Sequence, residues 1–151
     1  MREIEITREG FAVFARVVGA PDARALLYLQ GGPGFPAPRE RFEWMNVALA
    51  RGYQVVLLDQ RGTGRSTRID AATPELISTD VLTRLRADEI VADAEAVREK
   101  LGLDQWDVLG QSFGGFCLLH YLAVRPERVG RALFTGCLLY TSDAADEEDS
   151  V

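Results

Sequence analysis

A serine between glycines lies in the run Leu109–Gly115 (Leu-Gly-Gln-Ser-Phe-Gly-Gly). Residues 106–109 (Trp-Asp-Val-Leu) are typical of a buried strand, and residues 116–124 have apolar spacing compatible with a helix. Gly-x-Ser-x-Gly between a strand and a helix is typical of a nucleophile elbow, a strained turn that exposes the hydroxyl of Ser112 above the strand ends. The alternative is an ordinary strand–helix turn whose serine caps the helix.

Acyl transfer requires a nucleophile, a general base, and hydrogen-bond donors for the oxyanion that develops on the substrate. Ser112 supplies the nucleophile, and the backbone N–H of Phe113 supplies one donor at the start of the expected helix. A second donor must come from a loop whose backbone approaches closely, and Gly31–Gly34 (Gly-Gly-Pro-Gly) has the composition for it. The alternative for this loop is a phosphate cradle, but the endings typical of P-loops and dinucleotide sites are missing.

A second glycine-rich loop, Asp59–Ser66 (Asp-Gln-Arg-Gly-Thr-Gly-Arg-Ser), follows an apolar run at 53–58. The charges of Asp59 and Arg61 allow contact with a substrate. We favour a buried network in which this loop braces the Gly31–Gly34 loop, while direct contact with substrate stays the alternative.

The rest of the chain alternates short apolar runs with helical patterns. A continuous apolar run at 25–29 indicates a strand buried on both faces, a second buried strand is expected at 53–58, and a further strand is expected at 132–135. Helices are expected at 40–50, 79–86 and 88–101. Alternation at 4–7 and 11–18 predicts an N-terminal antiparallel hairpin.

This order of elements predicts an α/β fold with a mostly parallel sheet, flanking helices and right-handed crossovers. Ligands of such sheets bind beyond the carboxyl ends of the strands. The loops at Gly31, Asp59 and Ser112 all follow strands at that edge, so we expect them to meet there.

The composition narrows the function further. With 151 residues, 47% of them hydrophobic and 26% charged, the chain is typical of a soluble globular domain. Lys and Arg do not cluster with aromatic residues, which argues against a nucleic-acid partner.

Two cysteines, Cys117 and Cys137, provide neither a disulfide framework nor a four-ligand metal site, and we expect Cys117 to be a core residue. The sequence lacks a membrane-spanning run and a signal-peptide core, so we expect a cytoplasmic protein without a membrane partner.

Three segments together resemble the proline iminopeptidase (prolyl aminopeptidase) family of α/β-hydrolases: Gln30–Gly34, Asp59–Ser66 and Gly110–Gly115. Their order and spacing match the N-terminal half of that family. The resemblance implies an α/β-hydrolase fold and release of N-terminal proline from peptides, by a serine mechanism without a metal or other cofactor. One departure is Gln30, where many members have histidine, and we expect it to alter loop bracing rather than the chemistry of the nucleophile.

The resemblance also assigns roles to individual residues. It makes Ser112 the nucleophile and the backbone N–H groups of Gly32 and Phe113 the oxyanion hole. The residues that support these loops are then Gly31, Gly34, Asp59 and Arg61.

The sequence lacks the rest of a catalytic triad, which runs Ser, then Asp or Glu, then His along α/β-hydrolases. Its one histidine, His120, lies eight residues past Ser112, about 12 Å along the same helix, so we expect a packing or surface role for it. The later strands, the acid and histidine loops and the substrate-recognising lid are absent as well. We therefore expect residues 1–136 to be the N-terminal part of an α/β-hydrolase domain, in an incomplete and inactive fragment.

Residues 137–151 depart from the hydrolase-like pattern. They begin Cys-Leu-Leu-Tyr-Thr-Ser-Asp-Ala-Ala-Asp-Glu, which resembles the conceptual translation of a sequencing-library adapter, and their acidic residues account for most of the net charge of −6. We interpret this segment as a non-native tail, and a genuine acidic tail is the alternative.

Two other functions stay open at this stage. The first alternative to a proline iminopeptidase is another α/β-hydrolase, such as an esterase or lactonase acting on a small molecule. The second is a non-catalytic binding protein on the same fold. Nothing in the residues predicts the oligomeric state.

Overall fold

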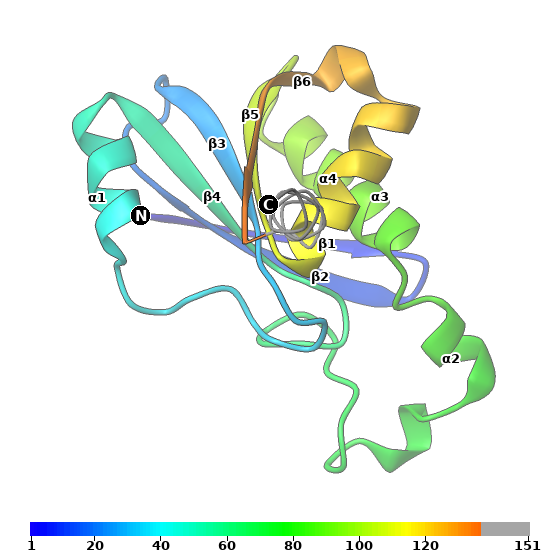
Figure 1. The fold of residues 1–151 in the computed structure, drawn as a ribbon. Coiled ribbons are helices and arrows are strands. Elements are labelled where there is room, and N and C mark those ends of the chain that lie inside the picture. The colour runs from blue at the N-terminus through cyan, green and yellow to red at the C-terminus, as the bar shows by residue number, and fades with distance from the viewer. Residues whose placement is uncertain (137–151) are drawn as a thin grey trace, which may run out of the picture.

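The computed structural model describes residues 1–136, which form a six-stranded sheet with helices on both faces (Figure 1). The strands are β1 (Arg2–Arg8), β2 (Phe11–Val18), β3 (Arg24–Leu29), β4 (Tyr53–Asp59), β5 (Trp106–Gln111) and β6 (Val129–Thr135). The helices are α1 (Glu43–Ala50), α2 (Thr79–Thr83), α3 (Ala87–Lys100) and α4 (Phe113–Val124), with short 3-10 helices at Pro74–Leu76 and Pro126–Arg128. Within residues 1–136, every helix is too short or too polar to cross a membrane.

The sheet has the strand order β1-β2-β4-β3-β5-β6. The pairs β1–β2 and β2–β4 are antiparallel, whereas β4, β3, β5 and β6 run parallel to one another. The predicted hairpin and the mostly parallel sheet are therefore confirmed. Because β4, β3 and β5 are parallel neighbours, the loops that follow them leave from one edge of the sheet.

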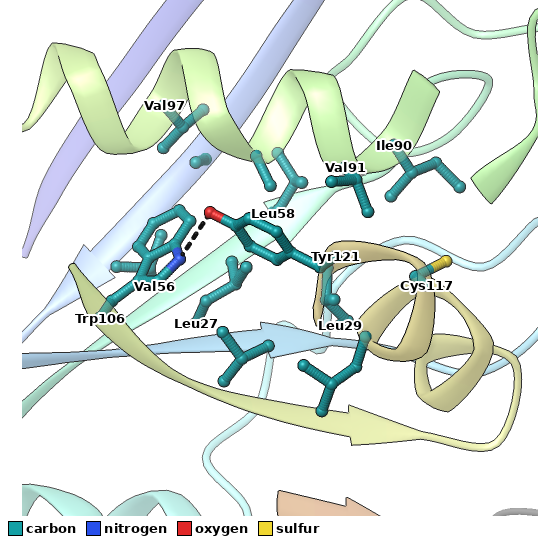
Figure 2. Close-up of a cluster of buried hydrophobic side chains, with 14 of the residues drawn as sticks. Leu27, Leu29, Val56, Leu58, Ile90, Val91, Val97, Trp106, Cys117 and Tyr121 are labelled. Atoms are coloured by element: carbon teal, nitrogen blue, oxygen red, sulfur yellow. Dashed lines mark hydrogen bonds between the residues drawn. The ribbon is translucent and has the colours of Figure 1, made fainter. Parts of the chain in front are cut away.

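Helices α3 and α4 cover one face of the sheet and α1 lies on the other (Figure 1). Alternate side chains of β3 face the two sides: Leu27 and Leu29 join the core under α3 and α4, and Tyr28 joins the core under α1. Figure 2 shows the first of these cores, in which the indole N–H of Trp106 donates to the hydroxyl of Tyr121 at 3.0 Å. Burial on both faces explains the continuous apolar runs at 25–29 in β3 and 55–58 in β4.

Some element boundaries differ from those predicted. The helix expected over 40–50 begins only at Glu43, because Phe42 is extended with a ψ of 159°. The helix after the elbow begins at Phe113, where the sequence places its N-terminus, although the apolar pattern at 116–124 marks only its later part. The last strand begins earlier than predicted, at Val129, and the helix expected over 79–86 ends at Thr83.

Candidate active site

Ser112 links β5 to α4 in a strained backbone conformation. Its φ of 50° and ψ of −118° lie outside the regions that residues with a side chain favour. Its N–H donates to the carbonyl of Thr135 on β6 at 3.0 Å, and its carbonyl accepts from the N–H of Gly115 at 2.8 Å. The Ser112 side chain makes no capping hydrogen bond to α4 and is exposed, so a capping serine does not explain this turn.

The glycines on either side of Ser112 are required by close backbone packing. A Cβ atom on Gly110 would lie 2.6 Å from the carbonyl oxygen of Gly114. One on Gly114 would lie 1.9 Å from the carbonyl oxygen of Leu29 in the neighbouring strand β3. Strand, turn and helix therefore approach so closely that only glycine fits at these two positions.

The Gly31–Gly34 loop lies directly beside the elbow. A Cβ atom on Gly31 would be 3.1 Å from the Cβ atom of Ser112 and 3.7 Å from its Oγ atom. Gly32 and Gly34 have φ angles of 130° and 96°, which favour glycine. The structure thus brings together the loop and the serine that the sequence assigned to one site.

Hydrogen bonds from buried glutamines hold the two ends of this loop. The Nε2 atom of Gln30 donates to the carbonyl of Phe35 at 3.1 Å. The carbonyl of Gln30 in turn accepts from the Nε2 atom of Gln60 at 3.2 Å. Gln60 lies inside the Asp59–Ser66 loop, so the second glycine-rich loop contacts the first through it.

Asp59 braces the segment that continues from the Gly31–Gly34 loop. Its buried carboxylate accepts from the N–H of Ala37 at 2.9 Å and from the guanidinium of Arg39 at 2.6 Å. It also accepts from the N–H of Arg65, at 2.8 Å, within its own loop. The carboxylate oxygens of Asp59 are therefore occupied by hydrogen bonds to other protein groups.

The side chain of Arg61 points into the protein, toward α3. Its guanidinium is fully buried and makes two hydrogen bonds to Asp93 of α3, at 2.7 and 2.6 Å. It also lies 4.7 Å from the ring centroid of Phe11. Arg61 therefore joins the Asp59–Ser66 loop to α3.

The sequence did not mark Tyr28, whose hydroxyl donates to the side-chain carbonyl of Gln111, the residue before Ser112. Burial raises the pKa of Tyr28, which keeps the hydroxyl protonated and able to donate. A strand tyrosine in an apolar run carries no signal of such a contact, because its partner lies on another strand.

A cavity of about 460 Å³ lies between the two glycine-rich loops. Its lining includes Gly34, Gly62, Leu85 and Ile90, with Arg68 and Asp70 also contributing. The guanidinium of Arg68 pairs with Asp70, and the backbone N–H of Ala72 is the main cause of the lowered pKa of that carboxyl. The cavity borders the loops of the site on the side of α3.

His120 lies on α4, where it lines a groove between α3 and α4 together with Glu95 and Val124. The residues that line this groove do not include Ser112. Within residues 1–136, no group of three or more His, Cys, Asp or Glu side chains is placed to hold a metal ion.

Comparison with known proteins agrees with this arrangement. A sequence model of the alpha/beta hydrolase fold matches residues 24–150. The proline iminopeptidase of Aeromonas sobria is 48% identical over 132 residues, which cover 81% of this chain and 30% of that protein. The proline iminopeptidase of Neisseria gonorrhoeae is 36% identical over 121 residues, covering 80% of this chain and 35% of that protein. The chain thus spans about a third of the length of these relatives, and its predicted similarity to proline iminopeptidases is confirmed.

Solved structures share the fold. A proline iminopeptidase-related protein from Thermus thermophilus superposes with a TM-score of 0.65 at 27% identity, over 91% of this chain and 45% of that one. A 2-hydroxy-6-oxo-6-phenylhexa-2,4-dienoate hydrolase from Rhodococcus gives a TM-score of 0.70 at 22% identity, over 91% of this chain and 46% of that one. The second likeness concerns the fold alone. With the sheet order, the strained serine turn and the family match in agreement, the chain belongs to the α/β-hydrolase fold family.

Proposed function

We propose that this chain is the N-terminal part of a serine aminopeptidase that releases N-terminal proline from peptides. The observation that supports it best is the exposed, strained Ser112 packed against Gly31 of the Gly-Gly-Pro-Gly loop. The similarity to proline iminopeptidases, at 36–48% identity, supports the substrate class. The cytoplasmic location expected from the sequence stays a prediction.

In the proposed reaction, the hydroxyl of Ser112 adds to the carbonyl carbon of the N-terminal proline and gives its proton to a general base. The resulting oxyanion accepts hydrogen bonds from the N–H groups of Gly32 and Phe113. Collapse of this intermediate releases the shortened peptide as its amino group takes up the proton. Water then hydrolyses the prolyl ester on Ser112, and proline leaves.

Other residues of the site have supporting roles in this proposal. Gly31 leaves room for the Ser112 side chain, and Gly34 allows the positive φ of the loop. Asp59 and Arg61 stabilise the loops: Asp59 accepts a hydrogen bond from the N–H of Ala37, and Arg61 donates to Asp93. None of these four transfers a proton or bonds to the substrate.

The general base and its acid partner come from outside this chain in our proposal. His120 lies on the helix that follows Ser112 and lines a groove elsewhere, so it does not serve as the base. We therefore propose that the 151-residue polypeptide is inactive by itself. The segment 137–151 lies outside the described residues, and its non-native origin remains part of the proposal.

The test begins with the genomic DNA downstream of codon 136. We expect it to encode further strands, a lid, an acid and a histidine, and we call the resulting polypeptide the complete enzyme. Genomic DNA that encodes the acidic tail followed by a stop codon would contradict the proposal that this chain is a fragment.

The complete enzyme is then assayed with a proline-arylamide and with short acyl esters. We expect faster turnover of the proline-arylamide, labelling by a serine-directed phosphonate, and loss of both in Ser112→Ala. Preferential ester turnover would assign an esterase or lactonase instead, and absence of labelling would indicate a binding protein.

A further inference from the structure

We propose that Gln30 is a positioning residue for the oxyanion loop, defined as residues 31–34. In this inference, the side-chain amide of Gln30 fixes the shape of the loop, and thereby the place of the Gly32 N–H beside Ser112. The inference rests on the proposed function, because it gives the Gly32 N–H its catalytic role.

The contacts of Gln30 join both ends of the oxyanion loop. Gln30 precedes the loop and is only 4% exposed, and its Nε2 atom donates to the carbonyl of Phe35, which follows the loop. Its own carbonyl accepts from the side-chain amide of Gln60, which is also buried. The amide of Gln60 therefore holds the residue before the oxyanion loop, and the amide of Gln30 holds the residue after it.

Apart from the ring of Pro33, which fixes one φ angle, the oxyanion loop has few constraints of its own. Gly32 and Gly34 adopt positive φ angles, and glycine has more backbone freedom to lose than any other residue. Phe35, at the end of the loop, is 68% exposed, so its ring does not anchor the loop in an apolar core. Since a backbone donor must be placed accurately to stabilise an oxyanion, the hydrogen bond from Gln30 affects catalysis through the position of the loop.

The Oε1 atom of Gln30 indicates that this side chain contributes little to the stability of the fold. Its Oε1 atom is buried and has no hydrogen-bond partner among residues 1–136. Exchanging the two amide atoms would place Oε1 against the carbonyl of Phe35, so the observed orientation is the favourable one. A buried unpartnered oxygen costs free energy, so removing the amide has a small net effect on unfolding.

The experiment replaces Gln30 in the complete enzyme and uses Gln54 as a matched control. Gln54 is 1% exposed and donates to the carbonyls of Pro21 and Ala23, near the amino end of β4 and away from the oxyanion loop. We expect Gln30→Leu to lower kcat by about 10- to 100-fold, with KM changed by less than about threefold. Gln54→Leu should lower the unfolding temperature more than Gln30→Leu does, while kcat stays near that of the complete enzyme.

Two further variants separate positioning from folding. Gln30→Asn keeps an amide but is one methylene too short to reach the Phe35 carbonyl, so it should lower kcat as Gln30→Leu does. Gln30→His provides an N–H donor that Gln30→Leu lacks, so its kcat should lie between that of Gln30→Leu and that of the complete enzyme.

The outcomes distinguish this inference from the proposed function. A complete enzyme that a serine-directed phosphonate does not label overturns the proposed function and this inference with it. A labelled enzyme in which Gln30→Leu or Gln30→Asn keeps kcat within about twofold of the Gln54→Leu value overturns only the role of Gln30.

Discussion

Gly31 packs against Ser112 so closely that a single added carbon on Gly31 would lie 3.1 Å from the Cβ atom of the serine. The two residues are 81 positions apart and follow β3 and β5, which pair in parallel at the centre of the sheet. The relationship is therefore a product of sheet topology. It also makes the space beside the Ser112 side chain sensitive to the addition of one methyl group.

Gly31→Ala is expected to lower the rate at which a serine-directed phosphonate labels Ser112 in the complete enzyme by about tenfold. The added methyl group would lie 3.7 Å from the Oγ atom of Ser112 and 3.1 Å from the Cβ atom of Ser112, so the serine must shift. Gly31 is not among the residues with positive φ, so alanine adds crowding without the strain of a left-handed backbone. The measurement is the labelling rate at several phosphonate concentrations.

Gly102→Ala is the control for this prediction. Gly102 has a φ of 69° with open space around it, so alanine there lowers stability by about 1 kcal/mol without touching the site. Labelling of Gly31→Ala at the rate of the complete enzyme would show that Ser112 accommodates the added methyl group, and would contradict this prediction.

The sheet and the meeting of the three loops were predictable because they depend on local signals. Apolar runs at 25–29 and 53–58 mark strands buried on both faces, and parallel strands place the loops after them at one edge. The elbow glycines follow a pattern whose physical reason is visible here in the approach of Gly114 to Leu29.

Contacts between polar side chains far apart in sequence were not predictable in this way. Asp93 lies among Ile90, Ala94 and Val97 on a helix, and its charge by itself favours a solvent-facing position. It is buried because Arg61, from another loop, supplies two hydrogen bonds. The sequence suggested a buried network around Asp59 and Arg61, but not which partners complete it.

Arg61→Met is expected to destabilise the complete enzyme by about 3 to 5 kcal/mol. The substitution leaves the carboxylate of Asp93, which is 1% exposed, with Arg8 as its remaining cationic partner. A buried charge that loses its partner costs more than the pair contributes. Urea unfolding of the variant and of the complete enzyme measures the difference.

Arg128→Met is the control, because the Arg128–Asp104 pair is exposed and should contribute less than about 1 kcal/mol. The double variant Arg61→Met/Asp93→Leu should be more stable than Arg61→Met, since it removes the buried carboxylate that has lost its two hydrogen bonds from Arg61. Equal losses in Arg61→Met and Arg128→Met would show that the buried pair has no special weight.

Alkaline pH is expected to destabilise the fold through Cys117. Burial raises the pKa of this thiol from 9.0 to about 12, whereas the unfolded chain keeps the ordinary value. Between these values the unfolded state has lost the proton and the folded state retains it. Cys117 therefore stabilises the fold fully below pH 9, and this contribution falls by up to about 1.4 kcal/mol per pH unit as the pH rises toward 12.

Cys117→Ala isolates this contribution in the complete enzyme. Below pH 9 it lowers the free energy of unfolding because it removes a buried side chain, but above pH 9 its decline with pH should be shallower than that of the complete enzyme. Tyr121→Phe is a useful comparison, since burial also raises the pKa of Tyr121, and its effect should begin only above the ordinary tyrosine value of 10. Parallel pH profiles for Cys117→Ala and the complete enzyme between pH 9 and 12 would show that the thiol ionises as readily in the folded core as in the unfolded chain.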